Sequence, residues 1–181
     1  MANIHKAIVC LFTSLLILAF SCNTDKNRIK CKVEEMRSVP IDLCLDKLSC
    51  KLHQQKHSDY KYKMIVYVDS TECTPCELGH LRFYIPLIDE AKKNKTNVGF
   101  YFIIAPKVQD WFDLNTEIEE TDIHGNIYID STYIFLNNNP TIPKEKKYHS
   151  FMLDRNNRIV FIGSPIDNER IKGIYKKSIL K

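Results

Sequence analysis

Cys73 and Cys76, three positions apart in "TECTPCEL", are the residues of this sequence whose type and spacing could carry chemistry. Two thiols at this spacing can pass electrons by cycling between a dithiol and a disulfide. The same spacing also forms half of a zinc site, but such sites usually need a second cysteine pair or paired histidines, and none is within reach in the sequence. A redox pair and a permanent disulfide remain as the two interpretations, and the flanking segments favour the redox pair.

The segment before the two cysteines is predicted to be a strand and the segment after them a helix. Residues 64–70, "MIVYVDS", are rich in branched and aromatic side chains, which is typical of a strand buried on both faces. After the motif, apolar residues recur at helical steps: Leu78, Leu81, Ile85 and Ile88. Pro86 lies inside this pattern and predicts a kink, because proline has no N–H for the preceding turn.

The rest of the chain predicts a mixed sheet. Residues 98–106 read as a second buried strand, so the first strand, the helix after the cysteines and this second strand form a right-handed parallel βαβ unit. Residues 107–120 are then predicted to be another helix. A third strand starts at Asn126, and residues 131–147 are predicted to be a loop. Residues 148–165 predict an antiparallel hairpin around "DRNNR", and Asp167 is expected to cap a last helix with an apolar stripe.

This order of elements, with the two cysteines at the first strand-to-helix turn, resembles the thioredoxin fold. The expected fold class is thus α/β, a central mixed sheet formed by a parallel βαβ half and a C-terminal β hairpin, with helices on both faces. The resemblance covers about residues 61–181 and is carried by "YVDSTECTPC" and "HSFMLDRNNRIVFIGSP". It points to the exported, membrane-anchored thioredoxin-like proteins of bacteria, which include thiol-disulfide oxidoreductases.

The predicted position of the cysteines assigns them different roles. Cys73, just before a helix, would be the nucleophile, because the positive end of the helix dipole and unpaired N–H groups stabilise a thiolate. Cys76, one turn on and expected to be less exposed, would be the resolving thiol. Thr74 and Pro75 form the loop between them, and Glu72 would oppose the thiolate through its charge.

The sequence departs from the thioredoxin pattern at the substrate groove. A cis proline usually stands there before the hairpin strand, whereas this chain has Tyr148 or His149 at the equivalent place. A cis bond at a residue other than proline costs about 3 kcal/mol, so we expect a trans peptide and an altered groove. His149 is either a groove or surface residue or a group that assists the thiolate.

The N-terminus is predicted to be an export signal. Residues 1–21 combine Lys6 with an apolar stretch and small residues before Cys22, which resembles a bacterial lipoprotein signal with Cys22 as the lipidation site. Residues 22–38 would then be a flexible, lipid-anchored tether and residues 39–181 the domain. We therefore expect a lipoprotein carrying fatty acyl chains such as palmitate, on the periplasmic or cell-surface side of an envelope membrane. Cleavage by the ordinary signal peptidase, without a lipid, is the alternative.

Three further cysteines follow Cys22 ahead of the motif. Cys44 and Cys50 in "LCLDKLSC" could close a short disulfide loop, which leaves Cys31 as the odd thiol. A metal site is the alternative at this place, because Cys50, His53 and His57 have ligand-like spacing and Cys44 could join them. Solvated histidines beside lysines are the commoner explanation, and no metal is expected.

The favoured function is a thiol-disulfide oxidoreductase of the bacterial cell envelope that needs no cofactor. Its partners would be protein or small-molecule disulfides or dithiols, together with an electron-relay protein. The alternative is a binding or assembly lipoprotein in which Cys73 and Cys76 form a permanent disulfide. A peroxidase is disfavoured, since no arginine lies close to Cys73. The net charge of +4 is spread through mixed sequence, so nucleic acid is not expected as a partner.

Overall fold

The computed structural model describes residues 25–52, 60–123 and 125–180, which belong to two compact units, Met1–Ser38 and Val39–Lys181. In the first unit residues 25–38 are helical, although the sequence predicted an irregular tether from residue 22. Exposed ion pairs at helical spacing support this helix: Asp25 pairs with Arg28 at 3.3 Å, and Lys30 with Glu34 at 3.8 Å. The export signal and Cys22 lie outside the described residues.

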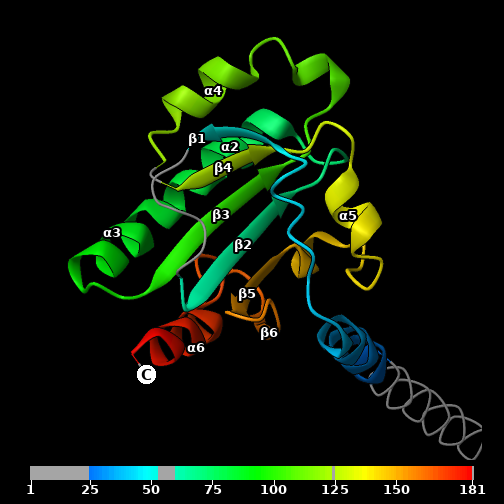
Figure 1. The fold of residues 1–181 in the computed structure, drawn as a ribbon, viewed down its shortest axis with the longest axis vertical. Coiled ribbons are helices and arrows are strands. Elements are labelled where there is room, and N and C mark those ends of the chain that lie inside the picture. Colours follow the sequence, from blue (N-terminus) through cyan, green and yellow to red (C-terminus); the bar gives the residue numbers. More distant parts are fainter. Residues whose placement is uncertain (1–24, 53–59, 124, 181) are drawn as a thin grey trace, which may run out of the picture. The chain divides into compact units, whose positions relative to one another are not determined.

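The second unit is built on one mixed sheet, in which the described residues form six strands (Figure 1). The strand order is β1-β4-β3-β2-β5-β6. β2 is parallel to β3 and β3 to β4, whereas β5 is antiparallel to β2, β6 to β5, and β1 to β4. The strands are β1 (Ser49–Leu52), β2 (Tyr62–Val68), β3 (Val98–Ile104), β4 (Asn126–Ile129), β5 (Ser150–Asp154) and β6 (Ile159–Ile162). The predicted parallel half and hairpin are both confirmed.

One face of the sheet carries the main apolar core. Alternate residues of the central strands point to this face, among them Val66 of β2 and Phe102 of β3, because side chains alternate along a strand. Against them pack apolar side chains of four helices: α2 (Thr74–Leu81), α3 (Ile85–Lys93), α4 (Leu114–Glu120) and α6 (Glu169–Ile179). This packing fixes α2, and with it the two cysteines, against the end of β2.

The opposite face is covered by shorter segments. Tyr67 of β2 points there, and its ring stacks on Phe135 of α5 (Ile134–Asn138) with 5.2 Å between ring centroids. The chain from Ile41 to Cys44 lies beside α5, where the side-chain amide of Asn139 donates a hydrogen bond to the carbonyl oxygen of Asp42. The sheet therefore has helices on both faces, as expected, and on this face the described residues of the unit place the short helix α5.

α5 lies in the segment that was predicted to be a loop. The carboxylate of Asp130, which is fully buried at the end of β4, accepts hydrogen bonds from the backbone N–H groups of Ile134 and Phe135, both at 2.9 Å. These bonds satisfy donors of the first helical turn, which have no partner inside a helix. The loop prediction was wrong here because this anchor stands four residues before the helix, where the apolar pattern does not reveal it.

Three further boundaries can be compared with the sequence. Pro86 is the second residue of α3, which follows a 3₁₀ turn, Arg82–Tyr84, so the helical pattern is interrupted just before the proline, near the place where a kink was predicted. The helix expected from residue 107 begins only at Leu114, after a separate 3₁₀ turn, Val108–Asp110. The cap of α6 is Asn168 and not Asp167: its side chain accepts hydrogen bonds from the N–H groups of Arg170 and Ile171.

Candidate functional site

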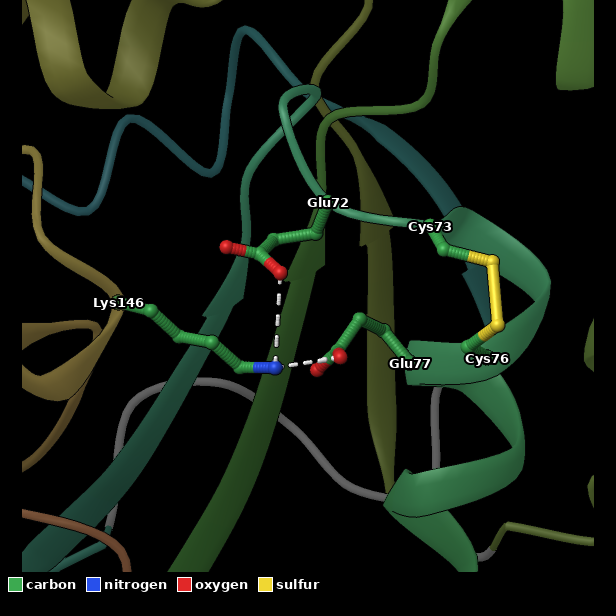
Figure 2. The surroundings of a disulfide bond; sticks show 5 residues. All are labelled: Glu72, Cys73, Cys76, Glu77 and Lys146. Atoms are coloured by element: carbon green, nitrogen blue, oxygen red, sulfur yellow. Dashed lines mark hydrogen bonds and ion pairs between the residues drawn. A yellow bond between two sulfur atoms is a disulfide. The ribbon is translucent and has the colours of Figure 1, made fainter.

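Cys73 and Cys76 are joined by a disulfide bond at the start of α2 (Figure 2). Asp69 shapes the turn after β2, because its side chain accepts from the N–H of Thr71 and its backbone oxygen from the N–H of Glu72. Cys73 is the residue that caps α2, and Pro75 occupies the first turn, where a missing N–H has little cost. The sequence prediction of a strand, a cysteine pair and a helix is therefore confirmed at this place.

Both cysteines are exposed, which differs from the prediction that Cys76 would be shielded. The cause is the helical periodicity of α2. Thr74, Leu78 and Leu81, at steps of four and three, are its buried residues, so Cys76 falls on the outer side. The residue between the cysteines that is covered is Thr74, which is fully buried. A partner molecule can therefore approach either sulfur atom.

Lys146 is a residue of this site that sequence reasoning missed. Its ammonium group forms ion pairs with both Glu72, at 3.6 Å, and Glu77, which is also its hydrogen-bond acceptor (Figure 2). Desolvation lowers the pKa of Lys146, but the hydrogen bond and charge of Glu77, together with Glu72, raise it above the ordinary value overall. Lys146 lies 69 residues from Glu77 in the sequence. The segment "KEKK" that contains it shows only a run of charged residues, which is typical of a solvated surface.

The segment predicted as a substrate groove has no cis peptide; all peptide bonds of the described residues are trans, as expected. Tyr148 ends the 3₁₀ turn Lys146–Tyr148, and His149 follows it. The N–H of Tyr148 donates to the oxygen of Glu145 and the N–H of His149 to that of Lys146, both at 2.9 Å. Neither residue therefore offers a free N–H to an extended substrate chain, which leaves the groove without the backbone pairing that the thioredoxin pattern implies.

The side chain of His149 is buried, with 2% of its surface exposed. Its Nε2 atom lies 3.0 Å from the carbonyl oxygen of Pro143, and its ring meets the ring of Tyr67 edge to face at 5.3 Å. Desolvation by burial lowers the pKa of His149 and so favours the neutral ring. These contacts support the interpretation of His149 as a packing residue over that of a proton carrier.

A groove runs beside α2 on the side of Lys146. A small hollow of about 50 Å³ is lined by Glu77, His80 and Lys146, among others, and adjoins a wider one of about 490 Å³. Lys146, Ser150 and Asp167 line both hollows. The ring of His80 lies 3.1 Å from the carboxylate of Asp167, so this pair joins α2 to the turn before α6.

The predicted disulfide between Cys44 and Cys50 is not present between these two described residues. Cys44 is buried with a positive φ of 51°, and its sulfur receives a hydrogen bond from the side chain of Asn138 at 3.2 Å. Cys50 lies in β1, opposite Tyr128 of β4. The backbone at Cys44 thus directs its thiol toward α5, and burial raises its pKa to about 11.

The metal alternative involves His53 and His57, which lie outside the described residues. Among the residues that the structure describes, no group of three or more His, Cys, Asp and Glu side chains is arranged to hold a metal ion. The same described part of the chain has no helix that is both long enough and apolar enough to span a membrane.

No protein-family model matches this chain, and no curated protein matches it. Solved structures do. A thioredoxin-like protein, determined in solution in its oxidised form, aligns with 78% of this chain and 92% of its own, at 13% identity and a TM-score of 0.51. The fold is thioredoxin-like.

A second structure supports this assignment. The bacterioferritin comigratory protein of Xanthomonas campestris, described for its alkyl peroxide reduction activity, has 10% identity and a TM-score of 0.52, with 77% of this chain and 96% of that chain covered. A hypothetical protein of Sinorhizobium meliloti has 13% identity and a TM-score of 0.42, over 60% of this chain. This chain spans only 58% of that protein's length. At such identities the likeness shows the fold alone.

Proposed function

We propose that this protein is a thiol-disulfide oxidoreductase that uses Cys73 and Cys76. The observation that carries the proposal is the exposed disulfide between them at the start of α2, in a domain with a thioredoxin-like fold. A disulfide at this position is open to attack by an external thiolate. In the reduced state, Cys73 lies where the partial positive charge of a helix N-terminus favours a thiolate.

The exchange has two steps. The Cys73 thiolate attacks one sulfur of a substrate disulfide, so that a mixed disulfide forms and one substrate thiolate leaves. Cys76 then loses its proton and attacks the Cys73 sulfur, which releases the second substrate thiolate and leaves the Cys73–Cys76 disulfide. The protein is oxidised by two electrons and the substrate is reduced by two. Regeneration needs an external dithiol, which is the role of the electron-relay partner.

The groove beside α2 is the proposed contact surface for the substrate. It adjoins α2 at Glu77, close in sequence to Cys76, and it offers polar groups from Lys146, Ser150 and Asp167. A substrate held there would not need the backbone pairing that Tyr148 and His149 lack. This arrangement suits a small-molecule disulfide or a cysteine presented on a protein surface better than an extended chain.

The cellular setting is proposed from the N-terminal sequence. Residues 1–21 would direct export, Cys22 would carry the lipid, and the domain would act in the bacterial cell envelope. In the sequence, the helix at residues 25–38 follows the proposed lipid site and precedes the domain. No organic cofactor or metal is required by the two-cysteine chemistry.

A second function is favoured by one observation. The N–H groups of Tyr148 and His149 are both used inside the protein, so the usual site for an extended substrate is lost. A binding or assembly lipoprotein that keeps Cys73–Cys76 as a permanent disulfide would tolerate this loss. The two functions differ in whether the disulfide exchanges.

Trapping of mixed disulfides tests the proposal. In the variant Cys76→Ser, a mixed disulfide at Cys73 cannot be resolved, so it should accumulate with a disulfide probe such as oxidised glutathione and be visible by mass spectrometry. The variant Cys73→Ser serves as the matched control and should accumulate much less adduct at Cys76. Equal and slow labelling of both variants would instead support the permanent disulfide.

A further inference from the structure

Lys146 connects the two acidic residues that directly flank the cysteine pair. Glu72 precedes Cys73 and Glu77 follows Cys76, and the ammonium group of Lys146 lies between their carboxylates (Figure 2). The side chain of Glu77 is 17% exposed and that of Glu72 is 32% exposed, so solvent screens these charges only in part. We call this set of three residues the Lys146 bridge.

The bridge matters because Glu72 and Glu77 are each next to a cysteine in the sequence, and negative charge near a thiolate opposes its formation. Reduction of the disulfide consumes two electrons and one proton when it yields a Cys73 thiolate and a Cys76 thiol. Negative charges nearby make the thiolate form less stable, whereas a positive charge has the reverse effect. The formal charges of Glu72, Glu77 and Lys146 add up to −1. If the charge of Lys146 is removed, the two carboxylates together carry −2.

Other charged groups lie on the elements around the turn, and their effects have to be kept constant in any test. His80 on α2 pairs with Asp167 before α6, and His149 is buried with a lowered pKa. α4, which also contacts α2, carries the acidic Glu117. None of these groups is in the bridge, so substitution of Lys146 leaves them in place.

We propose that Lys146 is a positioning residue for the redox couple: by holding Glu72 and Glu77 it favours the reduced, thiolate form of the cysteine pair. The inference rests on the proposed function and adds a residue to it. Lys146 contacts the carboxylates of Glu72 and Glu77, and it acts on the cysteine pair through them. It also ties the segment that precedes β5 to the turn that carries the cysteines.

The sequence supplies a matched control next to Lys146. Lys147 is exposed, and its ammonium group lies over the ring of Tyr148 at 5.1 Å. Replacement of Lys147 by methionine removes the same charge from the same turn but leaves the bridge intact. A difference between Lys146→Met and Lys147→Met therefore reports the bridge and not the overall charge of the protein.

The experiment is an equilibrium titration of the full chain against defined ratios of reduced and oxidised glutathione. Lys146→Met should shift the equilibrium constant about tenfold toward the disulfide, which corresponds to a reduction potential about 30 mV more negative. Lys147→Met should shift it less than twofold. The thiolate absorbance of the reduced protein, followed against pH, should show a higher pKa for Cys73 in Lys146→Met only.

Two more variants keep the inference testable if Lys146→Met does not fold. Lys146→Arg keeps the charge and should behave like the wild type, and Glu72→Gln removes one carboxylate and should shift the equilibrium toward the dithiol. Equal shifts in Lys146→Met and Lys147→Met, or no shift in Glu72→Gln, would overturn the role of the bridge. Failure of the proposed function looks different, because the wild-type disulfide itself would then resist exchange with glutathione.

Discussion

The backbone oxygen of His149 accepts a hydrogen bond from the backbone N–H of Tyr67 at 2.8 Å. This bond extends the pairing of β5 with β2 by one residue and holds the segment before β5 against the central strand. The ring of His149 is in contact with the ring of the same residue, Tyr67. The residue at the cis-proline place thus serves the packing of the domain.

Replacement of His149 by alanine should lower stability without a comparable effect on redox chemistry. The ring is buried and packs on Tyr67, so its loss should cost about 1 to 3 kcal/mol of unfolding free energy. Urea denaturation measures this cost. The reduction potential of the cysteine pair should stay within about 10 mV of the wild type, a change of roughly twofold in the equilibrium constant. A large change in potential with little loss of stability would indicate that His149 assists the thiolate.

Acidification should weaken the fold through His149. Its pKa is lowered in the folded state, so the unfolded state binds a proton first as the pH falls. Histidine in the unfolded state has a pKa of about 6.5, so above that pH the ring is neutral in both states and its titration does not affect stability. As the pH falls below that value, the free energy of unfolding should decline. The measurement is the difference in urea stability between wild type and His149→Gln at pH 7.5 and pH 5, a difference that should change sign or shrink at the lower pH.

Cys44 should be unreactive in the folded protein. Its thiol is buried, is contacted by Asn138 and has a pKa raised to about 11, so almost none of it is thiolate at pH 8. Alkylation by iodoacetamide, followed by mass spectrometry, should modify the exposed Cys31 and leave Cys44 unmodified until denaturant is added. Rapid modification of Cys44, or a Cys44–Cys50 disulfide in the purified protein, would contradict the structure.

Asp130 should be required for α5. Its buried carboxylate accepts from two backbone N–H groups, and Asp130→Ala would leave both without a partner, at a cost of about 1 to 3 kcal/mol. Asp130→Asn keeps one acceptor oxygen and serves as the control with a smaller loss. Urea denaturation compares them, and near-identical stability of both variants with the wild type would show that α5 is held in another way.

Asn168 and its neighbour Asp167 should contribute differently to the stability of the domain, because only Asn168 caps α6. Asn168→Ala removes the acceptor for the N–H groups of Arg170 and Ile171 and should destabilise the domain by about 1 kcal/mol. Asp167→Ala removes an exposed pair with His80 and should cost much less. Thermal denaturation measures both losses of stability. A larger loss for Asp167→Ala than for Asn168→Ala would instead support Asp167 as the cap, as the sequence predicted.

Strands β2 to β6 were predictable because they are short apolar runs with few alternatives, whereas β1, at the edge of the sheet, was not predicted as a strand. β2 and β3 are buried along nearly their whole length, and the hairpin is marked by the turn residues around Asn157, which adopts a positive φ of 57°. α5 was missed, since it depends on the side chain of Asp130 and not on an apolar period. The helix at residues 25–38 was missed for the similar reason that charge pairs, and not apolar residues, mark it.

The candidate site was predictable in part. The cysteine pair, the helix after it and the trans peptide at Tyr148 and His149 follow from local sequence. Lys146 could not be found this way, because its partners are far away in sequence and only the folded chain brings them together. The shielding of Cys76 was predicted wrongly, since the buried stripe of α2 passes through Thr74 and Leu78 instead.

The measurement that tests the central claim most directly is the reduction potential of the Cys73–Cys76 couple in glutathione buffers, with the dithiol and disulfide forms separated by alkylation and mass spectrometry. An exchanging pair should have a potential between about −120 and −270 mV, the range of known exchange proteins. A potential below about −300 mV, with no exchange at accessible glutathione ratios, would contradict the oxidoreductase and identify Cys73–Cys76 as a structural disulfide.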